Sequence, residues 1–271
     1  SRTVGDIDGI KSENGNVSFK NTGDITVANG SGIVADGGSV DVTAVGGGIE
    51  LGNMSVISGK NKVELLAEEA VTIDGGLVKA GKFAIPSDGS APTFAADDNA
   101  DLKVAAEKVE IKGASKVAAS GAADVDAKSG GVTVTGDGTA LVANGALAID
   151  ATDGGSVEVT GKAFVGGNST VEVGADGSTA SVTVNDAQLV AAGNLTVKAT
   201  DAVVAENGAK VASDGALTLS VSAVSGSVTV QGAQALGAES VAVDSEGTVE
   251  IDGGKVLAGK FDPATGEFYY G

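Results

Sequence analysis

The sequence predicts an all-β protein, a parallel β-helix (β-solenoid) of about ten coils with three short strands in each coil. Three observations predict it: apolar-x-apolar segments recur every 21–25 residues, turn-forming pairs separate them, and 43 of the 271 residues are glycine. Each segment alternates apolar and polar residues over too few positions for a helix, which is typical of a strand with one buried face. A fixed period of this length indicates a solenoid, and an ordinary β-sandwich is the alternative fold.

The first apolar segment of each coil marks the period. A second segment follows about eight residues later, and a third, looser apolar patch completes the coil. Only the step from Val63 to Leu102 is longer, at 39 residues, which indicates one coil plus an insert over residues 84–99. The first segments begin at Val17, Val40, Val63, Leu102, Ala123, Leu147, Val171, Leu195, Leu217 and Val241.

Asn-Gly and Asp-Gly pairs lie between the segments, as at Asn29-Gly30, Asp36-Gly37, Asp153-Gly154 and Asn207-Gly208. We expect these pairs to form the corners of the coils, because glycine and asparagine adopt positive φ at little steric cost. Ten coils stacked at the spacing of strands in a sheet would make a rod about 48 Å long. The sequence therefore predicts a single β-helix domain over residues 1–261, with the insert loop 84–99 and a C-terminal extension over residues 262–271.

The outward positions of the second segment alternate between threonine and glutamate. In stacked coils this alternation would place neighbouring glutamates nearly 10 Å apart, about one Debye length at moderate salt. We expect a Thr–Glu ladder, and the alternative is chance use of two common surface residues. The positions are Thr26, Glu50, Thr72, Glu110, Thr133, Glu158, Thr183, Val204, Thr229 and Glu250.

The composition excludes several classes of site. The chain has no His and no Cys, so zinc sites, disulfides and Ser-His-Asp triads are excluded. A net charge of −19 disfavours nucleic acid as a partner. No run of 18 apolar residues occurs, so we expect no membrane span.

Two stretches, Gly155–Gly161 (GSVEVTG) and Gly226–Gly232 (GSVTVQG), are characteristic of the repeat. With these stretches the sequence resembles the right-handed parallel β-helix proteins of bacterial surfaces, namely autotransporter passenger stalks and filamentous-haemagglutinin-like adhesins. The resemblance covers almost all of residues 1–261. It implies a secreted protein located outside the cell or on the bacterial surface, with the role of stalk, adhesin or scaffold.

Enzymes also use this fold, and their chemistry requires particular residues. Pectate-lyase-like enzymes use an arginine base beside calcium-binding carboxylates, and the chain's single arginine is Arg2, near the terminus. The adjacent pair Asp97-Asp98 in the insert could act as acid and base, although solvated loop pairs are far more common. We therefore expect a protein that is not an enzyme.

We expect no cofactor, with calcium as the alternative. The Asp-Gly corners offer hard oxygen ligands of the kind that calcium prefers. However, neither the G-G-x-G-x-D nonapeptide nor an EF-hand loop occurs in the chain.

Two extensions leave the coil pattern after nearly identical sequences. Val71–Phe83 is closely repeated as Val249–Phe261, and each copy leads into a segment that contains aromatic residues. Exposed aromatic side chains commonly anchor interfaces, so we interpret the segments as contact arms, and an ordinary protruding hairpin is the alternative. The interface residues predicted in this way are Phe94, Phe268, Tyr269 and Tyr270.

The function expected from the sequence is structural: an extracellular β-helical surface fibre or filament subunit, or an adhesin stalk, that assembles end to end. A parallel β-helix ends in unpaired strand edges, so we expect either a piece of a longer stalk or the stacking of one subunit on the next, which would produce filaments. The expected partners are further copies of the chain, in a homo-oligomer or self-assembling fibre, or a glycan or protein on a host or neighbouring cell. A carbohydrate-binding or carbohydrate-processing β-helix is the alternative, and it requires a groove lined with aromatic residues and carboxylates.

Overall fold

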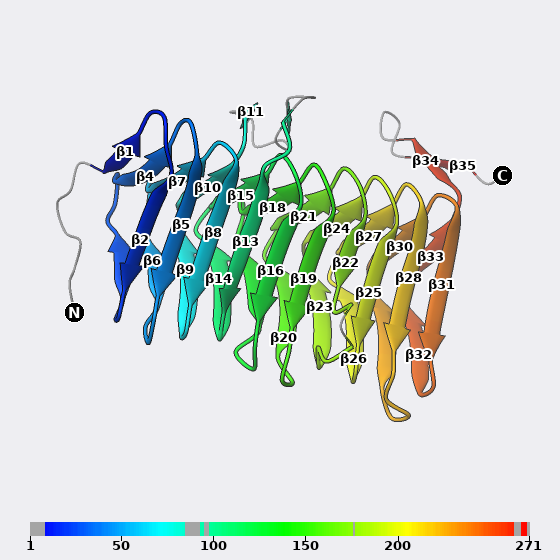
Figure 1. Cartoon of the computed structure of the whole chain (residues 1–271). Helices are drawn as coiled ribbons and strands as arrows, with labels where there is room; N and C mark the ends of the chain where they lie inside the picture. The colour runs from blue at the N-terminus through cyan, green and yellow to red at the C-terminus, as the bar shows by residue number, and fades with distance from the viewer. Residues whose placement is uncertain (1–8, 85–92, 95–97, 176, 263–266, 270–271) are drawn as a thin grey trace.

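The computed structural model describes residues 9–84, 93–94, 98–175, 177–262 and 267–269. In this part of the chain every regular element is a strand, and the coils stack side by side along one axis from the N-terminus to the C-terminus (Figure 1). Three long parallel sheets run the length of the rod, and each coil contributes one strand to each sheet. The predicted β-solenoid of about ten coils is confirmed.

The three sheets are named here A, B and C. Sheet A consists of β1 (Ile10–Ser12), β4 (Gly32–Ala35), β7 (Val56–Gly59), β10 (Leu77–Ala80), β15 (Lys116–Ala119), β18 (Ala140–Ala143), β21 (Phe164–Gly167), β24 (Gln188–Ala191), β27 (Lys210–Ser213), β30 (Gln234–Gly237) and β33 (Lys255–Ala258). Sheet B consists of β2 (Val17–Asn21), β5 (Ser39–Ala44), β8 (Lys62–Ala67), β13 (Asp101–Ala106), β16 (Ala123–Ala127), β19 (Leu147–Ala151), β22 (Val171–Val173), β25 (Leu195–Ala199), β28 (Ala216–Val221) and β31 (Ser240–Ser245). Sheet C consists of β3 (Ile25–Val27), β6 (Ile49–Leu51), β9 (Ala70–Asp74), β14 (Lys108–Lys112), β17 (Val132–Thr135), β20 (Ser156–Thr160), β23 (Ser181–Asn185), β26 (Ala202–Glu206), β29 (Ser227–Gln231) and β32 (Thr248–Asp252).

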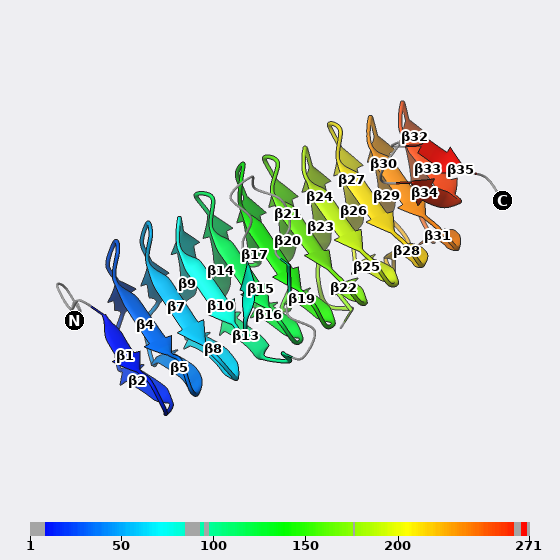
Figure 2. The same cartoon turned by 90° about the horizontal axis from the view of Figure 1, so that it is seen from above.

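Two short antiparallel hairpins accompany the sheets. The first joins β11 (Phe83–Ala84) to β12 (Thr93–Phe94), and the second joins β34 (Lys260–Asp262) to β35 (Glu267–Tyr269). Each follows a strand of sheet A; Figure 1 shows β11 and β34–β35 at the top of the rod, and Figure 2 shows β34–β35 beside β33. The long step in the period is therefore one coil interrupted by a hairpin.

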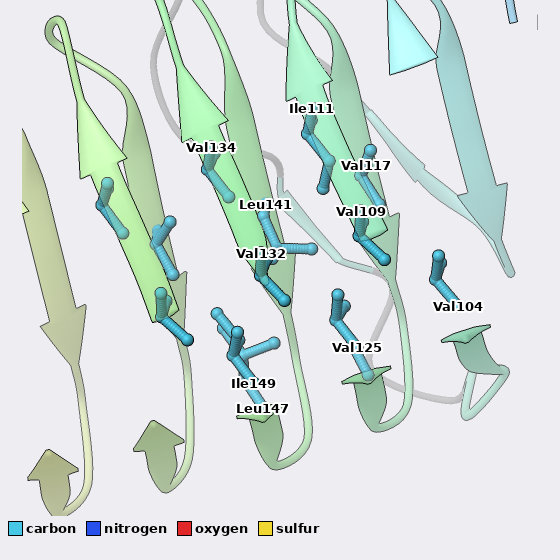
Figure 3. Close-up of a cluster of buried hydrophobic side chains, with 14 of the residues drawn as sticks. Val104, Val109, Ile111, Val117, Val125, Val132, Val134, Leu141, Leu147 and Ile149 are labelled. Atoms are coloured by element: carbon cyan, nitrogen blue, oxygen red, sulfur yellow. The ribbon is translucent and has the colours of Figure 1, made fainter. Parts of the chain in front are cut away.

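The core consists of aliphatic side chains stacked in register. Val109 pairs with Val132, and Val132 pairs with Val157, so each inward side chain rests on one of similar shape. Figure 3 shows Val104 and Val125 of sheet B facing the interior from the opposite side to Val109 and Val132 of sheet C. Full burial of one such side chain contributes roughly 1.5–3 kcal/mol, and each coil obtains it only from its neighbours.

The predicted Thr–Glu ladder is confirmed by the register of sheet C. Thr26 lies beside Glu50, Glu50 beside Thr72, and the alternation continues to Glu250 with the single break at Val204. Consecutive glutamates of the ladder are thereby separated by at least one coil, which limits their repulsion.

The corners follow the expectation only in part. At Asp153-Gly154 and Asn207-Gly208 both residues have positive φ, between 54° and 83°, as predicted. At Asp36-Gly37 the predicted corner forms, as a bend between β4 and β5, but Gly37 does not have the expected positive φ. A Cβ at Gly37 would lie 2.6 Å from the carbonyl oxygen of Glu13, so close approach of the coil below requires this glycine.

Candidate assembly surfaces

The most prominent break in the core lies at the last described coil. β31, β32 and β33 are the final strands of their sheets, and we call these three strands the C-terminal edge. In β32 Val249 is 48% exposed and Ile251 is 52% exposed. Their counterparts one coil earlier, Val228 and Val230, are each 1% exposed. Core side chains are therefore accessible at this edge.

Among the described residues, the backbone of the C-terminal edge also has no partner strand on its outer side. Within the rod, Ile25 and Val109 donate their N–H groups to the next coil, to the carbonyl oxygens of Gly48 (2.9 Å) and Gly131 (3.0 Å). Val249 has the same position in β32, so its N–H faces the side on which no described strand follows. A row of unpaired N–H and C=O groups beside exposed apolar side chains is a template for pairing with another strand.

The N-terminal end of the described rod has a different surface. The inward residues Val17, Ile25 and Val27 of β2 and β3 are all buried, in contrast to Val249 and Ile251. A small apolar pocket of about 20 Å³ is present there, and its lining includes Ile10 and Phe19. The apolar exposure is thus concentrated at one end of the rod.

Part of the outer face of sheet A is covered. Ala118 and Val142 pair with each other on this outer face, yet both are buried, and neither belongs to the main core cluster. β11 follows β10, the strand that precedes β15 in sheet A.

The four predicted interface residues fall in or next to the hairpins. The Cα register pairs Phe94 with Phe83, Phe268 with Phe261, and Tyr269 with Lys260. Tyr270 lies outside the described residues. The two hairpins lie over different parts of the rod (Figure 1), so these aromatic residues do not form one site.

Ion pairs that the sequence did not reveal occur on the outer face of sheet B. The Lys103 ammonium lies 2.9 Å from an Asp124 carboxylate oxygen and 3.1 Å from one of Asp126. These two carboxylates raise the pKa of Lys103. Burial raises the pKa of the Asp126 carboxyl and Asp124 raises it further, although Lys103 acts in the opposite direction. Asp124 and Asp126 follow Lys103 by 21 and 23 residues, which is close to the length of one coil. This spacing was the sequence signal from which the ion pairs could have been predicted.

A second charged group lies on the outer face of sheet C. Glu110 of the ladder forms ion pairs with Lys108 at 2.6 Å and with Lys112 at 3.4 Å. The hydrogen bond from Lys108 is the main cause of the lowered pKa of Glu110, and Lys112 adds to it. Lys108, Glu110 and Lys112 lie on the open surface of sheet C, so we assign these charges a role in stability rather than in a binding site.

Two open grooves on the rod are candidates for a glycan site. They have volumes of about 460 and 400 Å³, and no aromatic residue lines either of them. The first is lined by Leu66, Ala67, Ala105, Ala106, Asp126, Ala127, Lys128, Asp150 and Thr152. The second is lined by Asp24, Ile25, Thr26, Gly48, Ile49, Glu50, Ala70, Thr72, Glu110 and Lys112.

The residues considered for catalysis and calcium binding show no assembled site. Asp98 accepts a hydrogen bond from the backbone N–H of Lys82, and Asp97 lies outside the described residues. Across the described ranges, no group of three or more acidic side chains is arranged to hold a metal ion. In the same part of the chain, no helix has the length and apolar character needed to cross a membrane.

Val249 and Ile251 cannot be recognised as edge residues from the sequence, because their pattern is that of ordinary core residues. Comparison with known proteins adds no relative: no family model, curated protein or solved structure matches the chain. The β-solenoid assignment therefore rests on the strand order and register described above.

Proposed function

We propose that the protein is a non-enzymatic structural rod of the bacterial cell surface, a fibre subunit or adhesin stalk that joins a further β-helical coil through its C-terminal edge. The observation that carries this proposal is the exposure of Val249 and Ile251 beside unpaired backbone groups. An incoming strand would bury the exposed side chains and would also pair with the free backbone groups. Hydrophobic burial and strand pairing would therefore both favour binding at this edge.

The rest of the surface favours contacts at the end of the rod. With a net charge of −19, two rods lying side by side would repel each other. Val249 and Ile251 are 48% and 52% exposed, so their complete burial at the edge would recover about half of the roughly 1.5–3 kcal/mol that a fully exposed side chain would gain. Association is therefore directed along the rod axis, which is the geometry of a fibre or an extended stalk.

The extracellular location rests on the resemblance to bacterial surface β-helices and on the absence of cysteine from the sequence. The hairpin aromatics Phe94, Phe268, Tyr269 and Tyr270 remain the residues proposed for contact with a surface glycan or protein. A carbohydrate-binding role at the grooves receives less support, since no aromatic residue lines them.

End-to-end joining can be tested with one substitution in the edge and one matched substitution elsewhere. Ile251→Lys places a charge on the edge, whereas Val224→Lys changes a residue that is 74% exposed in the loop between β28 and β29. We expect negative-stain images and sedimentation velocity at increasing concentration to show end-joined rods for the parent and Val224→Lys, but not for Ile251→Lys. Single rods at every concentration, in all three proteins, would contradict the proposal.

A further inference from the structure

The two ends of the described rod differ in their strands. Sheet A has eleven described strands, whereas sheets B and C have ten each, because β1 precedes β2. We call β2, β3 and β4 the first coil. β2 and β3 are the first described strands of their sheets, but β4 is paired with β1 on its outer side.

The order of strands decides how a second copy can join the C-terminal edge. The edge ends with a sheet A strand, so the next coil has to begin with a sheet B strand, and β2 is such a strand. If β2 of a second copy paired with β31, its β3 would pair with β32 and its β4 with β33. The place that β33 needs beside β4 is the place of β1. Joining therefore requires the exchange of β1 for β33 of the other copy.

The outward side chains match across this joint. Glu250 in sheet C would lie beside Thr26 of the second copy, so the alternation of threonine and glutamate would continue from one rod to the next. In sheet B the carboxylate Asp244 would lie beside Lys20. In these strand pairs no carboxylate faces another carboxylate, so the charges favour the joint.

The inward side chains at the two ends are also complementary. Phe19 is partly buried against the core at one end, and Val243 and Val256 are partly buried against it at the other. Val243 would lie beside Phe19 of the second copy. Val256 would take the place of Ile10 beside Ile33. The joint would thus continue the apolar stack of the core from one copy to the next.

A coil inside the rod shows that a sequence like that of the first coil accepts a preceding coil. Residues 15–37 match residues 193–215 without a gap. In the second stretch β25, β26 and β27 pair with β22, β23 and β24 of the coil before them. The identical pairs are Gly15/Gly193, Asn16/Asn194, Lys20/Lys198, Thr22/Thr200, Asn29/Asn207, Gly30/Gly208, Asp36/Asp214 and Gly37/Gly215.

The same coil identifies a backbone group that would pair at the joint. The carbonyl oxygen of Asn194 accepts the N–H of Val171 in the preceding coil at 2.9 Å. Asn16 is equivalent to Asn194, and both asparagine side chains accept a backbone N–H of the following coil, at 2.9 and 3.0 Å. No described strand precedes β2 in sheet B, so the carbonyl of Asn16 would accept the N–H of Val241 of another copy.

The hairpin that follows β33 is compatible with further stacking. β10 is likewise followed by a hairpin, formed by β11 and β12, and it still pairs with β15 of the next coil. A hairpin after a sheet A strand therefore leaves the outer side of that strand open to a partner.

β33 is better suited than β1 to pair with β4. β1 pairs three residues with β4, whereas β33 has four. Leu257 would lie where Lys11 lies in the single rod, and Ala258 would replace Ser12 at an inward position. Lys11 forms an ion pair with Asp36 at 2.9 Å, but both side chains are exposed, and such pairs contribute little to stability.

We propose that β1 is an exchangeable strand, which covers β4 in the single rod and is displaced by β33 of a second copy when two rods join. The inference rests on the proposed joining of rods at the C-terminal edge, and it identifies the partner surface as the first coil of another copy. In the single rod β1 protects part of that surface, as covered edges do in other β proteins.

The test locks β1 in its place. The chain has no cysteine, so the double variant Lys11→Cys/Val34→Cys joins β1 to β4 by one disulfide between Cα partners. The control Val34→Cys/Ser58→Cys joins β4 to β7 in the same sheet, also between Cα partners. Both proteins are oxidised while dilute, and end-to-end association is then measured by sedimentation velocity with and without a reductant.

We expect oxidised Lys11→Cys/Val34→Cys to associate at least tenfold more weakly than its reduced form, and the control to associate equally in both forms. Equal association of the oxidised and reduced Lys11→Cys/Val34→Cys protein would overturn the inference and leave end-to-end joining intact.

A second measurement detects the exchanged strand directly. A chain with Leu257→Cys is mixed with a chain with Val34→Cys, and we expect a disulfide between the two chains, because β33 of one copy would lie beside β4 of the other. Rods that join without forming this disulfide would also overturn the inference. Single rods in every protein, oxidised or reduced, would contradict the proposed function and this inference with it.

Discussion

Ile73 and Ile251 occupy equivalent inward positions in β9 and β32, yet Ile73 is fully buried and Ile251 is 52% exposed. The difference arises because β14 covers β9, whereas β32 is the last described strand of its sheet. We predict that Ile73→Ala lowers the free energy of unfolding by about 2–5 kcal/mol, as expected for a buried aliphatic residue. Ile251→Ala should lower it by less than about 1.5 kcal/mol. Urea denaturation of dilute protein measures both, and equal losses would contradict an open edge.

Two serines on one inward column provide a second prediction. Ser55 is fully buried, and its hydroxyl has no hydrogen-bond partner among the described residues. Ser115, two coils further on, donates to the carbonyl of Ile73 and accepts the N–H of Gly75, both at 2.9 Å. We predict that Ser55→Ala raises the free energy of unfolding by about 1 kcal/mol, because an unsatisfied buried polar group is removed. Ser115→Ala should lower it by about 1–2 kcal/mol, and thermal denaturation of the two variants in parallel would show the opposite signs.

The charged groups of sheets B and C predict opposite effects of pH. The pKa of Glu110 is lowered in the folded protein, so its contribution is present above the pKa of the unfolded chain and is lost as pH falls through the folded pKa. Glu110→Gln should therefore cost up to about 1 kcal/mol at pH 7, and the loss should vanish in acid.

Asp126 should behave in the reverse manner. Its pKa is raised, mainly by burial, so the charged form is unfavourable at pH 7 and the group is protonated in both states below the unfolded pKa. Asp126→Asn is predicted to be neutral or stabilising by a few tenths of a kcal/mol at pH 7, with no gain near pH 3. Denaturation curves at the two pH values measure this, and a loss at pH 7 that persists in acid would refute the assignment.

The strand count predicts an effect of β1 on assembly. Deletion of residues 1–12 removes β1 and leaves ten strands in each sheet. β2, β3 and β4 of one copy could then pair with β31, β32 and β33 of another, and Lys20 would come beside Asp244 in the register of sheet B. We predict at least tenfold stronger end-to-end association by sedimentation velocity. Association weaker than that of the full chain would show that β1 does not obstruct the edge.

Much of the fold could be predicted from the sequence, because the solenoid repeats one local pattern. The first apolar segment of each coil was predicted to begin within one residue of where the sheet B strand begins. Examples are Val17 for β2 and Val40 for β5. The Thr–Glu ladder could also be predicted, since it requires only the order of coils.

Features that depend on the approach of neighbouring coils could not be predicted. The need for glycine at Gly37 arises from the carbonyl of Glu13 in another coil. The pairing of Lys103 with Asp124 and Asp126 depends on register, and a slip by one residue would turn these side chains to the other face. Ile251 is exposed because no described strand follows β32 in sheet C, and the local sequence pattern contains no information about this.

The central claim is that the C-terminal edge is open and receives a further coil. Amide hydrogen exchange of Val249 compared with Val71, its equivalent in the first copy of the repeat, tests it most directly. In dilute protein we predict exchange at Val249 at least 100-fold faster than at Val71, with the difference shrinking as concentration rises and rods join. Equal protection of the two amides at every concentration would contradict the claim.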